Sequence, residues 1–151
     1  MNVAAPTGEA ELDEAQLAAW RGLVRVHAAL VKELDAELEA RHGLPLTSYE
    51  VLRSLSNAPH GKLRMAELAE HAMLSRSGMT RLIDRLEREG MVGRTTCDKD
   101  GRGCYAVVTD RGRAAVEEAC ATYLAVVRSG FVKHFSLEEM QELAALLARP
   151  L

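Results

Sequence analysis

Four hydrogen-bonding side chains open a short segment in the middle of the chain. They are Arg76, Ser77, Thr80 and Arg81. An arginine can form two hydrogen bonds to a guanine in a DNA major groove, and serine or threonine can contact a base or a phosphate. Gly78 lies between them and has no side chain, which permits a close approach of the backbone. These residue types predict a surface that reads DNA.

The same segment has the apolar pattern of a helix that packs on a core. Its apolar residues recur at i, i+3, i+4 and i+7: Met79, Leu82, Ile83 and Leu86. This spacing places them on one helix face. Ser75 can cap the start, and Gly90 suits the left-handed residue that ends a helix. Arg85 and Arg88 then fall on the outer face with the four polar residues, and we expect Arg85 to contribute to DNA binding.

A β-hairpin is predicted directly after this helix. Residues 91–96 and 104–108 are rich in Val, Thr and Tyr, and Asp98-Lys-Asp-Gly-Arg-Gly103 between them has turn composition. Arg102 at the tip is the candidate for a minor groove, because a narrow groove concentrates negative potential. Further candidate DNA contacts are Lys62, Arg94 and Lys99. A helix followed by such a hairpin is the outline of a winged helix.

The charge distribution permits DNA binding although the whole chain is acidic. The formal net charge is −3. From His60 to Arg113 there are 11 Lys and Arg against 8 Asp and Glu, whereas the remainder has 8 against 14. The positive excess therefore lies on the predicted reading segment. Because phosphate attraction acts locally, the acidic total does not exclude nucleic acid.

The bulk composition favours one globular domain. The chain has 151 residues, of which 48% are hydrophobic, and no apolar run approaches the length of a membrane span. The acidic start lacks a signal-peptide pattern, so we expect a cytoplasmic protein with a flexible N-terminal arm over residues 1–11. No nucleophile–base pair, phosphate loop or metal-type Cys/His spacing is visible. The sequence therefore argues against an enzyme, a cofactor and a bound metal.

Long helices flank the reading segment on both sides. The first is predicted over residues 13–41, with a stripe formed by Leu17, Trp20, Val24, His27, Val31, Leu34 and Leu38. A second stripe follows a cap at Thr109 or Asp110 and comprises Val116, Ala119, Tyr123, Val127 and Phe131. Neither stripe has an evident partner within so small a reading part. Capping boxes are predicted at Thr47–Glu50 and Ser136–Glu139.

Three motifs at fixed distances resemble the MarR family of transcriptional regulators. They are Leu74-Ser-Arg-Ser-Gly-Met-Thr-Arg-Leu-Ile-Asp-Arg-Leu-Glu-Arg-Glu-Gly-Met-Val, the hairpin tip Asp100-Gly-Arg-Gly, and Val108-Thr-Asp-Arg-Gly112. The resemblance covers residues 12–149. It implies a mainly α winged helix-turn-helix domain with a β-hairpin wing. Residues 47–109 would form the DNA-binding part, and residues 12–46 and 110–149 would form dimerisation helices.

The resemblance also implies a mode of action. Members of the family are homodimers that bind pseudo-palindromic double-stranded DNA, repress by steric blocking and are released by a small ligand. Two reading helices would face successive major grooves about 34 Å apart. Asp100 would support the wing by holding an arginine, although an aspartate before a glycine is also a common turn former.

Ligand-binding residues are harder to assign. The resemblance places a ligand between the dimer helices and the reading part, where we expect Trp20, His27, Glu50 and Arg53. The run around Trp20 is similar to the branch that answers urate or small aromatic acids. Each residue also has a simpler interpretation. Trp20 could anchor a core, Glu50 could complete its capping box, and His27 could be an interface histidine or a pH sensor.

Two alternative functions stay open. Cys97 and Cys104 flank the hairpin turn and could form a disulfide that makes the regulator redox-responsive. In a cytoplasmic protein, however, two reduced thiols are the more common state. The other alternative is a winged helix that coats DNA or contacts a protein without any ligand.

Overall fold

The computed structural model describes residues 12–96 and 104–149 and is mainly helical. Its elements in chain order are α1 (Glu14–His42), α2 (Leu46–Asn57), the 3-10 turn η1 (Pro59–Gly61), β1 (Lys62–Arg64), α3 (Met65–His71), α4 (Arg76–Arg88), β2 (Val92–Thr96), β3 (Cys104–Val108), α5 (Asp110–Gly130), the 3-10 turn η2 (Val132–His134) and α6 (Leu137–Leu147). The predicted fold class, a mainly α chain with a small β-hairpin, is confirmed.

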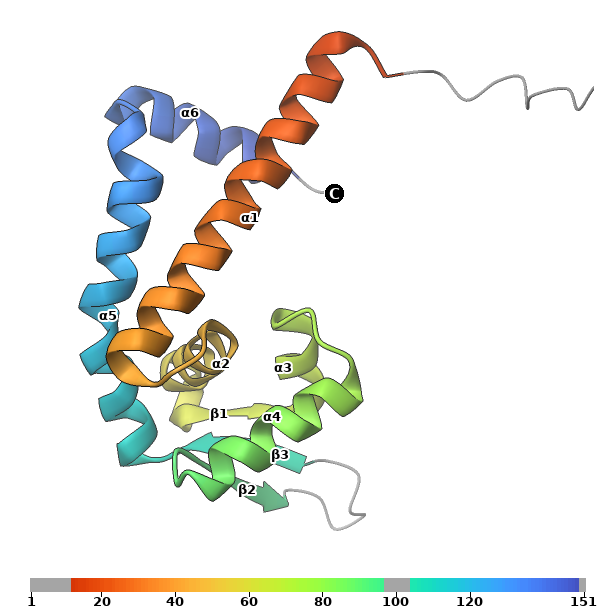
Figure 1. Ribbon diagram of the computed structural model, residues 1–151. Coiled ribbons are helices and arrows are strands. Elements are labelled where there is room, and N and C mark those ends of the chain that lie inside the picture. Colours follow the sequence, from red (N-terminus) through yellow and green to blue (C-terminus); the bar gives the residue numbers. More distant parts are fainter. Residues whose placement is uncertain (1–11, 97–103, 150–151) are drawn as a thin grey trace, which may run out of the picture.

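The chain forms a small helix-and-sheet unit from which long helices extend. Figure 1 shows α2, α3, α4 and the sheet grouped at one end, with α1 and α5 leading away from them. The C-terminal half of α5 runs beside the C-terminal half of α1, where the His42 ring lies 2.8 Å from the Thr122 hydroxyl. Helix α6 folds back from the far end of α5 (Figure 1). Helix α4, which carries the predicted reading residues, thus lies at one end of the molecule, away from α6.

Three antiparallel strands form the sheet in the order β1-β3-β2. Val92 lies opposite Val108 at one end of the hairpin and Thr96 lies opposite Cys104 at the other. On the other side of β3, Arg64 is the partner of Tyr105. The hairpin strands were predicted within one residue of their observed bounds.

Helix α1 is capped as its sequence predicts, but only its C-terminal half is buried. Asp13 and Gln16 form a capping box at the start, and Gly43 ends the helix with φ 60°. Leu34 and Leu38 are buried, whereas Trp20 is 60% exposed. Val24 and Val31 on the same stripe are also exposed. About half of the predicted apolar stripe is therefore exposed to solvent.

The capping box predicted at the start of α2 is wrong. The helix begins at Leu46, one residue before Thr47, and Thr47 makes no cap hydrogen bond. Leu46 is buried in the core, so its backbone enters the helix early, and its N–H donates to the carboxylate of Asp35 on α1 at 2.8 Å. An acceptor from a neighbouring helix thus replaces the local cap. Glu50 is released from the capping role that the sequence suggested.

Helix α4 forms as predicted. The Ser75 hydroxyl accepts a hydrogen bond from the Gly78 N–H at 3.1 Å, and Gly90 follows the helix with φ 76°. The predicted inward face is buried in full: Met79, Leu82, Ile83 and Leu86. These side chains join a single aliphatic core with residues of α1, α2, α3, the sheet and α5. The opposite face of α4 is consequently fixed toward solvent.

The stripe on α5 packs in part on the core of the same chain, which corrects the expectation that it has no partner there. Thr109 is the observed cap. Ala119 is buried, and the half-buried Tyr123 ring stacks on Tyr49 of α2 with centroids 4.9 Å apart. Helix α6 differs, because it has its predicted Ser136–Glu139 capping box but no buried residue.

Candidate nucleic-acid interface

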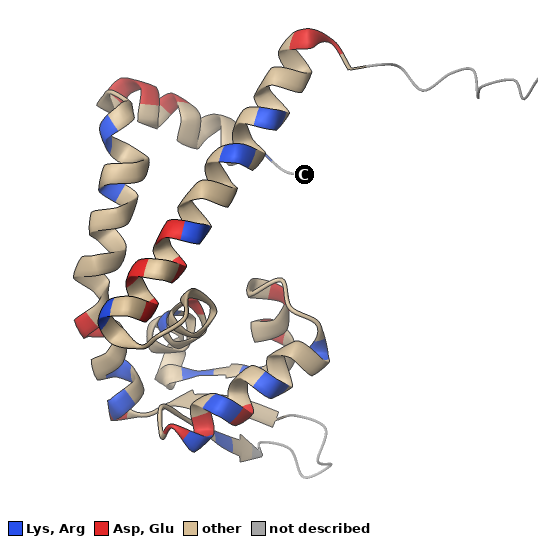
Figure 2. Cartoon of the chain, in the orientation of Figure 1, with Lys and Arg blue, Asp and Glu red and all other residues tan. Residues whose placement is uncertain are grey.

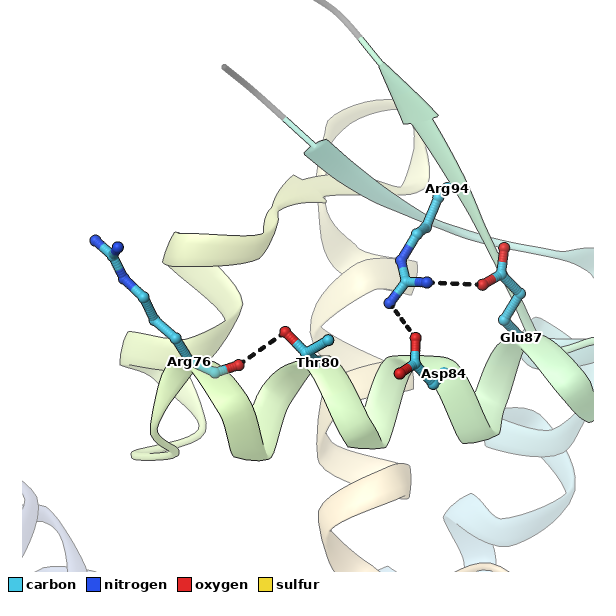
Figure 3. Close-up of polar contacts among 5 residues, drawn as sticks. All are labelled: Arg76, Thr80, Asp84, Glu87 and Arg94. Carbon is cyan, nitrogen blue, oxygen red and sulfur yellow. Dashed lines mark hydrogen bonds and ion pairs between the residues drawn. The ribbon is translucent and has the colours of Figure 1, made fainter. Parts of the chain in front are cut away.

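The first turn and a half of α4 presents the predicted reading residues to solvent. Arg76, Ser77, Thr80 and Arg81 are all exposed. Figure 3 shows the Arg76 guanidinium extending away from the helix, while the Thr80 hydroxyl donates to the Arg76 carbonyl oxygen at 2.9 Å. The hydroxyls of Ser75 and Ser77 lie 3.2 Å apart. Two arginines on one exposed helix start have the reach and the donors that base edges require.

Gly78 lies close against the cap of α4. A Cβ at this position would lie 3.2 Å from the Ser75 hydroxyl oxygen and 3.8 Å from the Leu74 Cβ. The first of these contacts is tighter than ordinary van der Waals packing. The glycine therefore lets the cap turn close against the helix, a role that the sequence-based idea of close approach to DNA did not include.

Arg85 follows the exposed Arg81 by one turn of α4, but its own side chain is directed at α2. Its side chain is half-buried, and its Nη2 donates to the hydroxyl of Ser48 on α2 at 2.6 Å. Ser48 is 1% exposed, and among residues 12–96 and 104–149 it is the one polar side chain that is buried in the core. The sequence placed Arg85 with the DNA contacts, whereas the structure places its guanidinium against α2.

Arg94 joins the wing to the reading helix. Its Nη2 lies 2.5 Å from an Asp84 carboxylate oxygen, and its Nη1 lies 3.0 Å from Glu87 (Figure 3). The hydrogen bond to Asp84 raises the pKa of the Arg94 guanidinium, and partial burial opposes the rise. A guanidinium held by two carboxylates fixes β2 against α4, and only its remaining donors could reach a phosphate.

Two cations lie on the edge strand β1. Lys62 and Arg64 both lie over the Tyr105 ring, with the Nζ and Cζ atoms 5.5 and 5.2 Å from its centroid. The Arg64 Nε also donates to the Tyr105 hydroxyl at 3.1 Å. Lys62 was among the predicted contacts, but Arg64 was missed. The signal that could have found it is the cross-strand pairing of Arg64 with Tyr105, which needs the sheet register.

Arg64 and Arg76 border one cleft beside the reading helix. It has a volume of about 340 Å³ and is lined by Arg64, Met65, Ala66, Arg76, Met79, Thr80 and Cys104. Figure 2 shows that α4 carries both signs of charge along its length. The acidic residues of α4 include Asp84 and Glu87, and both form ion pairs with Arg94. Arg76 and Arg81 at the helix start have no carboxylate partner among the described residues.

Several residues of the wing tip have roles predicted from the sequence. Lys99, Asp100 and Arg102 lie outside the described residues, as does Cys97. Cys104 is exposed and free, and its strand partner is Thr96. The proposed redox pair therefore has no structural support within the described residues.

The residues expected at a ligand site are only partly brought together. Glu50 and Arg53 line a second cavity of about 340 Å³ between α2, α3 and α5, with Ser54, Asn57, His71 and Tyr123 among its other residues. The Arg53 guanidinium lies 5.4 Å from the centroid of the Tyr123 ring. Trp20 and His27 do not line this cavity, although His27 is near enough to influence Glu50 electrostatically.

Two acidic groups near this cavity are perturbed. Partial burial raises the pKa of the Glu50 carboxyl, while Arg53 and His27 oppose the rise. Burial together with Cys120 raises the pKa of the Tyr49 hydroxyl to about 12, and Arg53 lowers it by a smaller amount. Both groups thus favour their neutral forms more than the same side chains in water. Within residues 12–96 and 104–149 no acidic, histidine or cysteine cluster could hold a metal, and no helix could span a membrane.

The fold and this surface define a winged helix-turn-helix protein, and comparison with known proteins identifies the family. The family model described as MarR matches residues 42–103. The HTH-type transcriptional repressor Rv2887 of Mycobacterium tuberculosis is 39% identical over 97 residues, which make up 64% of this chain and 68% of that protein. The chain therefore belongs to the MarR family of DNA-binding transcriptional regulators, which are not enzymes.

Two solved structures from Streptomyces coelicolor show the same fold over nearly the whole chain. The MarR family regulator AbsC superposes with a TM-score of 0.83 at 31% identity, covering 93% of this chain and 94% of its own. The regulator Sco3205, solved in complex with DNA, gives a TM-score of 0.84 at 28% identity, covering 94% of this chain and 89% of its own.

Proposed function

We propose that the protein is a homodimeric repressor that binds a pseudo-palindromic operator and is released by a small anionic or aromatic ligand. The observation that carries the proposal is the exposed start of α4, where Arg76 and Arg81 point outward from a helix whose inner face is buried. The M. tuberculosis relative is named a repressor, and Sco3205 was solved bound to DNA. Both facts support the same role for this chain.

The base-reading set comprises Arg76, Ser77, Thr80 and Arg81. Phosphate and groove contacts are assigned to Lys62, Lys99 and Arg102, with Asp100 supporting the wing. Phosphate contacts would fix the register of the protein on the duplex, and the side chains of α4 would supply sequence preference. Each arginine that pairs with a guanine would contribute about 1–3 kcal/mol of discrimination against a wrong base.

Unpaired apolar surface on the long helices supports the homodimer. Helix α6 has no buried residue, and Leu137 and Leu147 on it are 76% and 59% exposed. Trp20 and Val24 on α1 add to this apolar surface. Burial of such side chains between two copies is favourable by about 25 cal/mol per Å² of apolar area. Two copies joined through α1, α5 and α6 would hold two reading helices at a fixed separation.

The cavity beside Glu50 and Arg53 supports a small effector. Arg53 offers a cation and Tyr123 an aromatic ring, a combination that suits an aromatic acid. The cavity is lined by α2 and α5, so an occupant would touch both the reading part and the long helices. The proposed release follows if occupancy favours a different separation of the two reading helices.

Selection of DNA fragments by the purified protein tests DNA recognition. We expect enrichment of one pseudo-palindromic sequence with half-sites about one helical turn apart. Gel filtration tests the assembly, since a dimer elutes near twice the 16.5 kDa mass of the chain. Enrichment of no sequence would contradict operator reading, and a stable monomer that binds the operator would contradict the dimer.

Fluorescence of the single tryptophan provides a test for the ligand. Salicylate, urate and 6-carbon aliphatic acids would be titrated against the protein, with emission and operator affinity measured in parallel. We expect an aromatic acid to weaken operator binding and, because Trp20 lies outside the cavity, to change its emission through movement of α1. Arg53→Ala should abolish both changes while leaving operator affinity without ligand intact. Release that persists in the Arg53 variant would show that this cavity is not the effector site.

A further inference from the structure

We propose that Arg85 is a positioning residue, which sets the orientation of the reading helix through Ser48 and makes no contact with DNA. The inference rests on the proposed function in one respect, namely that α4 reads DNA. It concerns a residue that the sequence pattern alone grouped with the DNA contacts. The evidence is the direction of its side chain, the burial of its partner and the connections of α2.

The side chain of Arg85 is directed at α2. Its guanidinium donates to Ser48 at 2.6 Å, whereas Arg81, one turn earlier on the same side of α4, is exposed. Both arginines border a cleft of about 240 Å³ together with Thr47, Leu74, Gly78 and Leu82. Within this cleft Arg81 is exposed, whereas the Arg85 guanidinium reaches Ser48 of α2.

Loss of the hydrogen bond between Arg85 and Ser48 would be destabilising because Ser48 is buried. Ser48 is 1% exposed, so its hydroxyl has no access to bulk water. A charged donor forms a stronger hydrogen bond than a neutral one, and a buried polar group left without a partner is destabilising. Within the described residues this is the one side-chain hydrogen bond between α2 and α4. Hydrophobic packing holds the two helices together, and this bond specifies their relative rotation.

Helix α2 links the contact to the rest of the molecule. Asp35 of α1 accepts from the backbone of Leu46 at 2.8 Å, two residues before Ser48. Glu50 and Arg53, on the next turn of α2, line the cavity proposed for a ligand. A polar path therefore runs from α1 through the start of α2 to the middle of α4. Any displacement of α2 would be passed to the reading helix through Arg85.

The test is a double-mutant cycle on the intact protein with its selected operator. Arg85→Ala, Ser48→Ala and the double variant would be measured for specific and non-specific DNA affinity over a range of salt concentrations. We expect each single change to weaken operator binding by about three- to tenfold. The double variant should lose no more operator affinity than the single variant with the larger loss. Non-specific affinity and the salt slope should stay at wild-type values.

Direct contact predicts a different pattern. If Arg85 neutralises a phosphate, Ser48→Ala binds as wild type, and Arg85→Ala weakens all sequences and reduces the salt slope by about one. That result overturns the proposal. Arg88→Ala is the matched control, because Arg88 is exposed on the same helix and its loss removes one charge without touching Ser48.

Folding of the variants is checked by thermal unfolding and gel filtration. Alanine is a better helix former than serine and smaller, so Ser48→Ala is expected to fold. Should it not fold, Ser48→Cys supplies a weak acceptor of similar size and is expected to show the same loss of specific affinity. If the wild-type protein selects no operator, the proposed function fails together with this inference. If the wild-type protein selects an operator and the Arg85 and Ser48 variants bind it with wild-type affinity, the inference alone fails.

Discussion

Arg94 on β2 and Asp84 on α4 form an ion pair, with the guanidinium nitrogen 2.5 Å from the carboxylate oxygen, and Glu87 adds a second contact at 3.0 Å. We expect Arg94→Ala to lower the free energy of unfolding by about 1 kcal/mol, because it leaves two carboxylates side by side on α4. Urea unfolding at low and at high salt measures the effect, which should shrink as salt screens the charges.

Arg41→Ala is the matched control for this change. Arg41 also pairs with a carboxylate, that of Glu37 at 2.7 Å, but both side chains are on the exposed surface of one helix. Such i, i+4 pairs contribute about 0.3–0.5 kcal/mol. Equal losses in the two variants would show that Arg94 acts as an ordinary surface arginine and does not hold the wing.

Gly112 marks the closest approach between α5 and the start of the wing. A Cβ at this position would lie 2.3 Å from the backbone oxygen of Met91 and 2.8 Å from a Val108 methyl group. We therefore expect Gly112→Ala to destabilise the protein by about 1–3 kcal/mol, as overpacking does elsewhere. The measurement is again urea unfolding at fixed protein concentration.

Gly93→Ala provides the comparison, because nothing lies within 4 Å of a Cβ at Gly93. That variant should unfold at or above the wild-type urea concentration. A Gly112→Ala protein as stable as Gly93→Ala would mean that α5 and Met91 can separate without cost.

We expect Glu50→Gln to differ from wild type in stability by an amount that depends on pH. Partial burial raises the pKa of the Glu50 carboxyl, so the folded state binds this proton more tightly than the unfolded state does. As the pH rises through the pKa of Glu50 in the folded protein, its carboxyl becomes charged and the free energy of unfolding falls. Below the ordinary glutamate pKa of 4.5 the carboxyl is neutral in both states, so this loss is absent. Glu50→Gln should therefore be more stable than wild type at pH 7 and equal to it near pH 4. A constant difference at both pH values would exclude titration of Glu50 as the cause.

The Arg102→Ala variant tests the contribution of the wing tip to DNA affinity. Arg102→Ala should weaken binding to every DNA sequence and reduce the salt slope, because one groove or phosphate contact is removed. Titrations with operator and with unrelated DNA at several salt concentrations would show this. Unchanged affinity for both would remove the wing tip from the mechanism.

The reading helix could be predicted because its signals are local. A serine cap, four apolar residues at helical spacing and a closing glycine all lie within residues 75–90, and each has the predicted role. The hairpin is equally local, since its strands are near neighbours in the sequence. Short-range hydrogen bonds and one amphipathic period were sufficient for both elements.

Features that depend on distant residues could not be predicted in this way. The cap of α2 comes from Asp35 on α1, and the stacking of Tyr123 on Tyr49 joins residues far apart in the chain. Arg85 showed the same limit, since an arginine on an outer helix face has the same pattern whether it meets DNA or a buried serine. Only the packing of α2 on α4 distinguishes these cases.

The central claim is that the exposed start of α4 reads base sequence, and repeating the DNA selection with Arg76→Ala and Arg81→Ala tests it most directly. We expect at least one of these variants to lose its preference at one position in each half-site, with a cost of about 1–3 kcal/mol on the wild-type operator. If both variants select the wild-type consensus unchanged, α4 does not read the DNA and the account is contradicted.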